Sequence, residues 1–270
     1  MGALHEEVHG SGPVLLLIPG GNGDADGYAR IAGPLAQRYT VVGYDRRGFA
    51  RSAGAAAIAG DRLSADTDDA RDLIDKHATG PAAVFGSSSG AIVGLELLRR
   101  YPDRVATLVA HEPPLLTLLS DADERLAFID GVYETYRREG VAAAMAVFLA
   151  GIGLERPAGA PPPAPMLARM RANQEYWLEH ELRQYARAVP DLDALRAHVD
   201  RLVLAGGAES RERGHLPYRP AVVLAERLGA GLVEFPGGHL GYLTHPAAFA
   251  ERLTGVLSPR AAADRPRGTP

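Results

Sequence analysis

Apolar residues along the chain form short continuous runs that alternate with segments of helical periodicity. Each run is bounded by turn residues and is short enough to be a strand buried on both faces. Four such runs precede residue 115: 13–18, 40–45, 82–85 and 106–111. The segments between them repeat apolar residues at helical spacing, most clearly over 89–100, where Ile92, Leu95 and Leu98 share one side. This alternation predicts an α/β protein with a mostly parallel central sheet and helices on both faces.

One of the predicted helices, after the second apolar run, is rich in acidic residues. Ser64 can cap its N-terminus, and Asp66, Asp68 and Asp69 then fall in its first turn. Carboxylates in that position interact favourably with the helix dipole. This interpretation gives the three aspartates a local role in the helix.

The alternation stops after Pro114 and resumes near residue 200. From Leu115 to His198 the apolar positions follow helical spacing, interrupted by residues 156–165, a proline-rich stretch that predicts an extended loop. A strand, a helix, a strand and a closing helix then follow at 200–207, 219–229, 231–236 and 246–257. The pattern predicts a core formed by residues 1–114 and 199–258, a helical insertion at 115–198 and a disordered tail at 259–270.

The amino-acid composition indicates a globular protein and excludes several kinds of partner and chemistry. Of the 270 residues, 46% are hydrophobic and 23% are charged, as is typical of an ordinary globular protein. The formal charge of −4, without a run of basic residues, argues against a nucleic-acid partner. The absence of cysteine excludes disulfides and thiolate chemistry.

The first residues show no pattern of a targeting segment. The sequence MGALHEEVHG is acidic where a signal peptide is basic, and the apolar run Val14–Ile18 is too short to span a bilayer. We therefore expect a cytoplasmic protein without a membrane partner. A homodimer is one option for its assembly.

Residues 84–94, VFGSSSGAIVG, join a predicted strand to a predicted helix and contain a G-x-S-x-G pattern. Gly86 and Gly90 fix the register and place Ser88 at the central position. Such a serine sits in a strained turn, and glycines flank it because larger side chains would collide with neighbouring backbone. We expect Ser88 to be a nucleophile and the backbone N–H of Ser89 to be an oxyanion donor.

A candidate general base lies near the end of the chain, and a serine hydroxyl needs such a base at neutral pH. His239 falls in a glycine-rich loop after the last predicted strand, from which its imidazole can reach the carboxyl edge of the sheet. His245, at the start of the closing helix, is expected at the surface or as a cap. His111 admits two interpretations, a wall of the site or a buried core histidine, and we prefer the second.

Two glutamates are candidates for the acid that would orient His239. Glu209 follows the predicted strand 200–207 at the turn where such an acid usually falls, and Glu112 ends the strand before the insertion. Glutamate has one methylene more than aspartate, so either carboxylate could reach the histidine from a slightly retracted backbone. We prefer Glu209 and keep Glu112 as the alternative. The non-catalytic interpretation is a solvated acid for Glu209 and a buried carboxylate held by backbone donors for Glu112.

A second oxyanion donor is expected in the loop IPGGNGDADGY, residues 18–28. Glycine lets the backbone turn its N–H groups toward a bound carbonyl, and Gly21 is the favoured position, with Asn22 next. A plain glycine turn is the alternative. Asp24 and Asp26 are expected to serve turn and cap roles.

Taken together, these segments resemble the α/β-hydrolase fold superfamily from about residue 14 to residue 257. The family order of serine, acid and histidine is met by Ser88, then Glu209 or Glu112, then His239. Five segments match the family pattern in order: LLLIPGGNG, VVGYDRRGFARS, VFGSSSGAIVG, YPDRVATLVAHEPP and LVEFPGGHLGYLTHP. The chain departs from the family in Pro19, where histidine is frequent, and in a glutamate where the acid is more often aspartate.

The resemblance implies a serine hydrolase that needs neither a cofactor nor a metal. His239 would take the proton of Ser88 as it attacks a carbonyl, and water would later release the acyl group. The helical insertion would form a cap over the site. Six of its residues could line an acyl pocket, although for each of them packing in the helix core is the preferred interpretation: Phe128, Tyr133, Phe148, Met166, Met170 and Trp177.

The expected substrate is an ester or lactone of a medium-sized apolar small molecule. Two alternatives remain on the same scaffold. One is a hydrolase of carbon–carbon bonds or a cofactor-independent lyase or cyclase. The other is a ligand-binding member of the family without turnover, because a fold does not fix a function.

Overall fold

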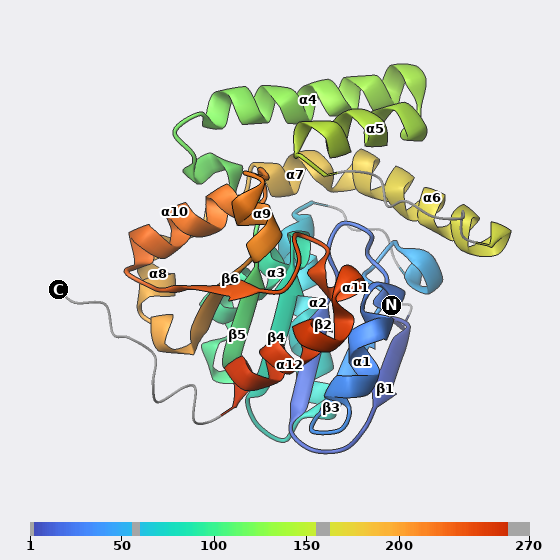
Figure 1. Cartoon of the computed structure of the whole chain (residues 1–270). Coiled ribbons are helices and arrows are strands. Elements are labelled where there is room, and N and C mark those ends of the chain that lie inside the picture. Colours follow the sequence, from blue (N-terminus) through green and yellow to red (C-terminus); the bar gives the residue numbers. More distant parts are fainter. Residues whose placement is uncertain (1–2, 56–59, 155–162, 259–270) are drawn as a thin grey trace.

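Among the residues that the structure describes, the central sheet in the computed structural model has seven strands in the order β1-β3-β2-β4-β5-β6-β7 (Figure 1). The structure describes residues 3–55, 60–154 and 163–258. β1 pairs antiparallel with β3, and every other pair of neighbours is parallel. The strands are β1 (Glu6–His9), β2 (Val14–Ile18), β3 (Thr40–Tyr44), β4 (Ala82–Ser87), β5 (Val105–His111), β6 (Leu202–Gly207) and β7 (Leu232–Phe235). The predicted mostly parallel α/β sheet is confirmed.

Strand β1 is missing from the expectations drawn from the hydrophobic pattern. Its sequence EEVH has no continuous apolar run, and two of its four residues are exposed. It lies at the edge of the sheet, where Glu6 pairs with Tyr44 and His9 with Val41. An edge strand that is partly open to water needs no apolar run, so the pattern cannot reveal it.

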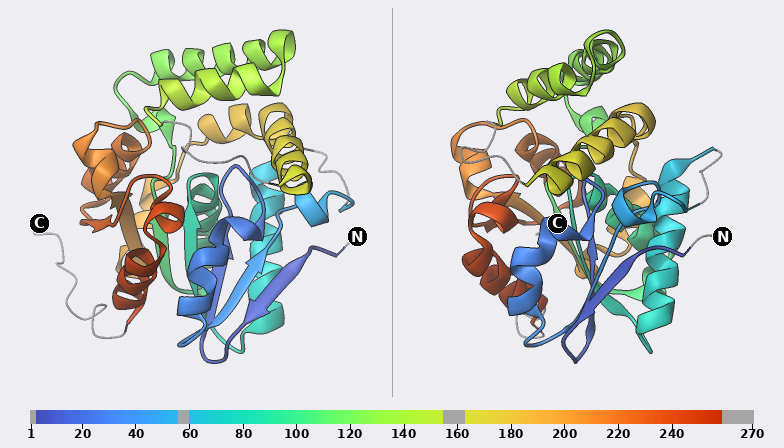
Figure 2. Two further views of the ribbon diagram at one scale, coloured as in Figure 1. Left: turned by 45° about the vertical axis from the view of Figure 1, so that its right-hand side comes forward. Right: turned by 90° about the vertical axis from the view of Figure 1, so that its right-hand side faces the viewer.

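Helices cover both faces of the sheet, as the two views in Figure 2 show. One face carries α1 (Ala29–Leu35) and α12 (Pro246–Leu257). The other face carries α2 (Arg62–His77), α3 (Ser89–Arg100), α8 (Leu192–Arg196) and α10 (Tyr218–Leu228). Leu15 and Leu17 of β2 point to the first face and Leu16 to the second. Because both faces are buried, the inner strands read as continuous apolar runs.

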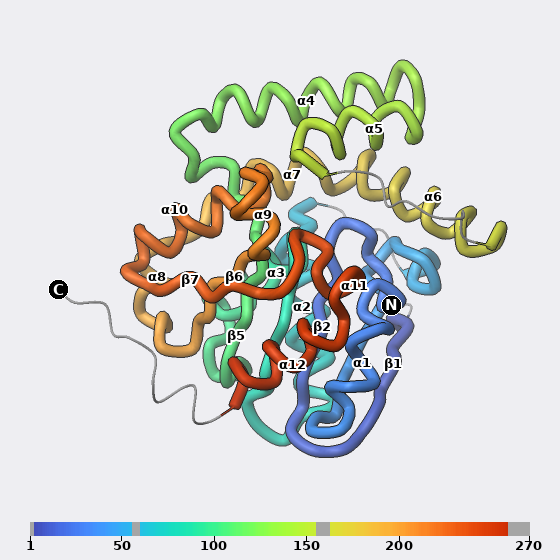
Figure 3. Tube along the Cα trace, in the orientation of Figure 1, coloured from blue at the N-terminus to red at the C-terminus, as the bar shows by residue number. Residues whose placement is uncertain are grey.

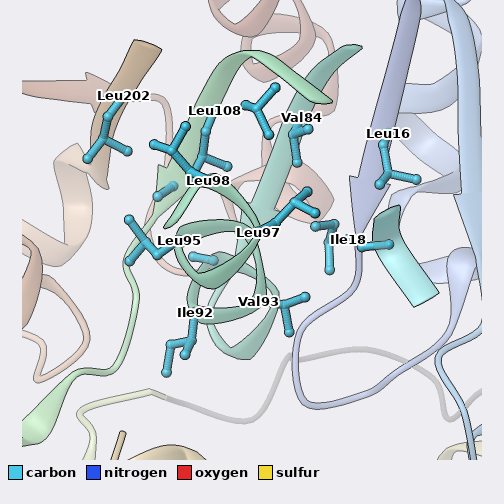
Figure 4. Close-up of a cluster of buried hydrophobic side chains, with 14 of the residues drawn as sticks. Leu16, Ile18, Val84, Ile92, Val93, Leu95, Leu97, Leu98, Leu108 and Leu202 are labelled. Atoms are coloured by element: carbon cyan, nitrogen blue, oxygen red, sulfur yellow. The ribbon is translucent and has the colours of Figure 1, made fainter. Parts of the chain in front are cut away.

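Helix α3 is packed closely against the sheet. Leu97 of the helix lies near Val84 of β4, and Leu98 lies near Leu108 of β5 (Figure 4). Gly94 permits the close approach, since a Cβ there would lie 2.7 Å from a methyl group of Leu108. Each fully buried aliphatic side chain contributes about 1.5–3 kcal/mol to stability. This packing holds the first turn of α3 in a fixed position beside the end of β4.

A layer of helices lies over the carboxyl ends of the strands (Figures 1 and 3). It consists of α4 (Ala122–Glu139), α5 (Val141–Gly151), α6 (Ala164–His180) and α7 (Leu182–Ala186). We call these helices the α4–α7 layer. Ile129, Val132 and Leu178 form its interior and pack with Phe49 and Leu116 below them. The layer therefore shares a hydrophobic cluster with the sheet domain.

Two helices begin earlier than predicted. The N-cap of α2 is Asp61, whose side chain accepts a hydrogen bond from the N–H of Leu63 at 3.1 Å, and not Ser64. Helix α6 begins at Ala164, inside the stretch predicted as a loop, with Pro165 in its first turn. Proline is tolerated there because the first N–H groups of a helix have no partner within the helix.

The rest of the proline-rich loop prediction, residues 156–162, lies outside the described residues, as does the predicted tail 259–270. Within the described ranges, no helix is both long enough and apolar enough to cross a bilayer.

Candidate active site

Ser88 occupies the sharp turn between β4 and α3. Its φ is +57°, and its N–H donates to the carbonyl oxygen of His111 at 2.9 Å. A Cβ at Gly86 would lie 2.2 Å from the carbonyl oxygen of Gly90, and a Cβ at Gly90 would lie 2.2 Å from that of Ile18. Only glycine fits at these two positions, which is the steric reason for the G-x-S-x-G spacing. The turn presents the serine at the carboxyl edge of the sheet in a strained conformation that its surroundings hold.

His239 lies in the loop between β7 and the short helix α11 (Gly241–Thr244). Its side chain is mostly buried, and Nδ1 is 2.7 Å from Oε2 of Glu112. Since Nδ1 faces the carboxylate, Nε2 is the nitrogen that remains for other partners. Ser88 and His239 both line the same two cavities beneath the α4–α7 layer.

Glu112 follows the last residue of β5, and its side chain is fully buried. Its φ is +46°, and its N–H donates to the carbonyl oxygen of Ala205 at 2.9 Å. Oε1 accepts a hydrogen bond from the N–H of Gly207 at 2.8 Å, while Oε2 faces His239. Burial by itself would raise the pKa of Glu112, but the hydrogen bonds with His239 and Gly207 and the charges nearby lower it to about 2. The carboxylate is therefore ionised at neutral pH and holds the imidazole in one orientation.

Glu209, the preferred acid in the sequence analysis, lies elsewhere. It belongs to the short helix α9 (Ala208–Glu212), and its carboxylate is 3.7 Å from Nε2 of His245. The side chains of both residues are more than 40% exposed. The structure brings the alternative, Glu112, to His239 and leaves Glu209 at the surface. The end of β6 still serves the site, through the backbone N–H of Gly207 and not through a side chain.

The expected oxyanion donors surround Ser88. Gly21 and Asn22 line the larger cavity together with the serine. A Cβ at Gly21 would lie 2.7 Å from Nε1 of Trp177, so glycine is required for the indole to lie against this loop. Ser89 is the first residue of α3, and its N–H has no partner within the helix. The positive end of the helix dipole therefore also points toward this edge of the sheet.

Two cavities meet above Ser88 and His239, with volumes of about 60 Å³ and about 190 Å³. Phe148, Ile152 and Trp177 line both of them. The rings of Phe148 and Trp177 meet edge to face at 4.9 Å. The smaller cavity is further lined by apolar residues, among them Leu116, Ile129, Leu182 and Leu216. The larger cavity adds polar groups, among them Asn22, Asp24, Gln174 and Tyr242.

Of the six residues for which pocket lining is the alternative to helix packing, Phe148 and Trp177 line the cavities. The other four lie at other places in the α4–α7 layer. Phe128 packs inside it against Gly151, and Tyr133 stacks under the guanidinium of Arg183 at 3.5 Å. Met166 is exposed and Met170 is half-buried.

His111 lies behind the site in a fully buried position, in line with the core interpretation. Its Nδ1 is 3.1 Å from Oγ of Ser87, and its ring packs against Phe235 and Phe249. Burial disfavours the charged imidazolium and lowers the pKa of His111 to about 4. This histidine is therefore neutral at pH 7, and its ring lies 6.4 Å from that of His239.

A buried charged cluster lies next to residues 18–28, the loop expected to hold an oxyanion donor, which we call the oxyanion loop. The hydrophobic pattern of the sequence does not predict this cluster. It joins Arg46 and Arg62 to Asp66 and to Glu181 of the α4–α7 layer. The arginines of the segment DRRGFARS, directly after a buried strand, were the available signal. Their partners could not be read from the sequence because Glu181 is 135 residues from Arg46.

In the part of the chain that the structure describes, no group of three or more histidine, cysteine, aspartate or glutamate side chains is placed to hold a metal ion. The site thus consists of Ser88, His239 and Glu112 at the carboxyl edge of the sheet, below two cavities.

Known proteins are similar to this chain in sequence and in fold. Residues 13–150 match the family described as alpha/beta hydrolase fold. The chain is 38% identical over 260 residues to the uncharacterized hydrolase YraK of Bacillus subtilis (strain 168), which covers 94% of this chain and 92% of that protein. It is 30% identical over 260 residues to the zearalenone hydrolase of Bionectria ochroleuca, with 91% and 90% covered.

Among solved structures, a thermophilic esterase from Thermogutta terrifontis superposes with a TM-score of 0.70 at 21% identity. The alignment covers 96% of this chain and 93% of that one, and at this identity it bears on the fold alone. The family match includes strands β2 to β5 and the serine turn, and each of the two sequence relatives aligns with more than 90% of the chain. The chain therefore belongs to the alpha/beta hydrolase fold family.

Proposed function

We propose that the protein is a serine hydrolase that cleaves an ester or lactone of a medium-sized apolar molecule. The observation that carries the proposal is the pair formed by His239 and the ionised, fully buried Glu112, 2.7 Å apart. The pair opens onto the same cavities as Ser88, which sits in a strained turn at the N-terminus of α3. A nucleophile, a base and an acid that orients the base are the parts that acyl transfer requires.

In the proposed reaction, Nε2 of His239 removes the hydroxyl proton of Ser88 as its Oγ attacks the substrate carbonyl carbon. The carbonyl π electrons move to oxygen, and the N–H groups of Gly21 and Ser89 stabilise the resulting oxyanion. His239 then gives the proton to the departing alkoxide, which leaves an acyl-enzyme. Water attacks the acyl group in the same way, and its hydroxyl group completes the carboxylic acid while the proton returns to Ser88. Glu112 stays ionised throughout and stabilises the imidazolium.

The α4–α7 layer supports the choice of an apolar substrate. We propose that residues 115–198 act as a cap that shields the reaction from water and shapes the substrate. Two cavities of unequal size that both include Ser88 in their lining suit a substrate with two arms, one wholly apolar and one that also carries polar groups. The similarity to a zearalenone hydrolase supports a hydrolytic reaction.

The test of the proposed function combines turnover with covalent labelling. The wild-type protein and the Ser88→Ala variant are assayed on p-nitrophenyl esters with acyl chains of different lengths and on lactones. Both are treated with a fluorophosphonate, and labelled peptides are identified by mass spectrometry. We expect turnover and labelling at Ser88 in the wild type and loss of both in the variant, by about 10³-fold or more for turnover.

Two results would contradict the proposal. If wild type and variant are equally inert and no label reaches Ser88, the protein is a binding member of the family without turnover. If Ser88 is labelled but no ester or lactone is cleaved, the alternative chemistry on the same scaffold, carbon–carbon bond cleavage or a lyase or cyclase reaction, takes its place.

A further inference from the structure

Arg46 connects three parts of the molecule from a fully buried position after β3. Its Nη1 donates to Oδ2 of Asp66 at 2.9 Å. Its Nη2 donates to Oε1 of Glu181 at 2.8 Å and to the carbonyl oxygen of Gly20 at 2.8 Å. Gly20 directly precedes Gly21, the proposed oxyanion donor. One guanidinium therefore holds the oxyanion loop and a glutamate at the junction of α6 and α7.

The cluster is closed by a second arginine and a tyrosine. Nε of Arg62 is 3.3 Å from Oε2 of Glu181 and also 3.3 Å from Asp66, while Nη2 donates to the carbonyl oxygen of Arg47 at 2.7 Å. The hydroxyl of Tyr185 donates to Oδ2 of Asp66 at 2.7 Å. The two arginines and the two carboxylates balance in charge and are at most 3% exposed. Removing one member alone would leave a buried charge without its partner.

Net stabilisation is a weak explanation for such a cluster, because the cost of removing the charges from water offsets much of their attraction. An apolar cluster of similar volume would hold the α4–α7 layer on the sheet equally well. The charged cluster differs in one respect: it supplies a side-chain hydrogen bond to the Gly20 carbonyl oxygen, which among the described residues otherwise accepts only the N–H of Gly23 within the same turn, at 2.9 Å. Rotating that peptide changes the direction of the backbone that follows it, including the N–H of Gly21.

Helix α6 reaches the same loop through a second contact. Trp177 lies one turn before Glu181, whose N–H donates to the carbonyl oxygen of Trp177 at 2.9 Å. The indole lies directly on Gly21. The end of α6 is therefore connected to two consecutive residues of the oxyanion loop. Arg46 links Glu181 to Gly20, and the indole of Trp177 contacts Gly21 directly.

We propose that Arg46 and Glu181 are positioning residues that couple the seating of α6 to the orientation of the oxyanion donor at Gly21. In this arrangement the oxyanion hole is complete when the end of α6 is in place on the loop. The inference rests on the proposed serine-hydrolase function, and it adds a role for a cap residue in the chemical step and not only in substrate shape.

The chain offers a matched control in the neighbouring ion pair. Arg47 follows Arg46 in sequence, and its guanidinium binds Asp69 through Nε at 3.0 Å and Nη2 at 2.5 Å. This pair is nearly as buried, and it lies between the same turn and the same helix α2. Its contacts are to the side chain of Asp69 and not to the oxyanion loop. Asp69→Asn therefore disturbs a buried ion pair without touching Gly20.

The experiment compares Glu181→Gln with Asp69→Asn by steady-state kinetics on a p-nitrophenyl ester and by the rate of fluorophosphonate labelling. For Glu181→Gln we expect kcat and the labelling rate to fall together by about 10–100-fold, with KM changed by less than about threefold. For Asp69→Asn we expect both rates within about threefold of the wild type, whatever its loss of thermal stability.

Fluorescence gives a readout that does not depend on turnover. Trp177 is the only tryptophan of the chain, so the emission spectrum reports the contact between α6 and the loop. We expect a red-shifted emission and stronger acrylamide quenching in Glu181→Gln and an unchanged spectrum in Asp69→Asn. If Glu181→Gln is poorly folded, the double variant Arg46→Met/Glu181→Met replaces it, because Arg62 and Asp66 then still pair with each other. This variant should stay folded and still lose kcat by about 10–100-fold.

Three outcomes overturn the inference while the wild type is labelled and active. One is a Glu181→Gln variant with wild-type kcat, another is an Asp69→Asn variant that loses as much kcat, and the third is a folded double variant with full activity. If the wild type itself is neither labelled nor active, the proposed function is wrong. In that case the fluorescence of Trp177 still tests the coupling between α6 and the oxyanion loop, and an unchanged spectrum in Glu181→Gln overturns it.

Discussion

The carboxyl edge of the sheet and the α4–α7 layer face the same cavities but are built in different ways. At the edge, Ser88 and Glu112 both have positive φ, and backbone N–H and carbonyl groups of adjacent strands hold them in place. In the layer, Phe148 and Trp177 contribute apolar surface through side-chain packing. We expect the proposed chemistry to depend mainly on positions that the backbone fixes. We expect substrate selection to depend on apolar side chains of the layer such as Phe148, whereas Trp177 also lies against Gly21.

The largest loss of activity is expected for Glu112→Gln, a substitution at the carboxyl edge of the sheet. The amide keeps the size of the side chain but removes the negative charge that stabilises the imidazolium of His239. We expect kcat on an ester substrate to fall by about 10²–10⁴-fold while KM changes little. Steady-state kinetics measure the change, and circular dichroism confirms that the variant is folded. A folded Glu112→Gln variant with wild-type kcat would remove Glu112 from the mechanism.

Behind the same edge, His111 makes stability depend on pH. Its pKa in the folded protein is about 4, below the ordinary value of 6.5, so the unfolded chain binds this proton first as the pH falls. Its contribution to stability is fully present above pH 6.5 and is lost as the pH falls to 4, with a total of about 3 kcal/mol. Denaturant unfolding of the wild type and of His111→Phe at pH 7 and pH 4.5 measures how much unfolding free energy each protein loses between the two pH values. The wild type should lose more stability between these values than the variant; equal losses would show that His111 titrates normally.

Phe148→Ala tests the layer. The substitution removes part of the apolar lining that the two cavities share, while the edge residues remain in place. We expect the ratio of kcat/KM for a branched, bulky acyl ester to that for a short linear one to rise by about tenfold, because the enlarged cavity admits the larger group. A panel of esters gives the ratio. Equal changes for bulky and short esters would indicate that Phe148 acts on the chemistry and not on selection.

The smallest effect is expected for Glu209→Gln, which is the matched control for Glu112→Gln. Both residues follow a strand of the sheet, but the carboxylate of Glu209 lies in solvent near His245. We expect kcat and KM within about twofold of the wild type, as for a surface substitution away from the site. A loss of kcat comparable to that of Glu112→Gln would assign the acid to Glu209 after all.

The sequence allowed the elements near the proposed nucleophile to be predicted because the signals there are local. The serine turn depends on glycines two residues away on either side, and helix α3 begins and ends as its periodicity predicts. The edge strand β1 and the start of α6 could not be predicted. The first has too little apolar patterning, and the second depends on where a proline-rich stretch turns into a helix.

The choice between Glu112 and Glu209 could not be made from the sequence for a different reason. Both glutamates follow parallel strands, and what separates them is the direction of the backbone after the strand. Glu112 turns inward with a φ of +46°, whereas Glu209 enters a short surface helix. The pairing of Arg46 with Glu181 was likewise hidden, because it joins two layers that are distant in sequence.

A cut in the chain between β5 and β6 would separate the candidate site residues into two fragments. Ser88 and Glu112 precede the α4–α7 layer and His239 follows it, while β5 and β6 lie side by side in the sheet. A chain cut between these two strands yields one fragment with the nucleophile and the acid and another with the base. Neither fragment alone contains the proposed triad, so the proposed hydrolase activity would report the association of the two fragments, as in a split-protein complementation assay.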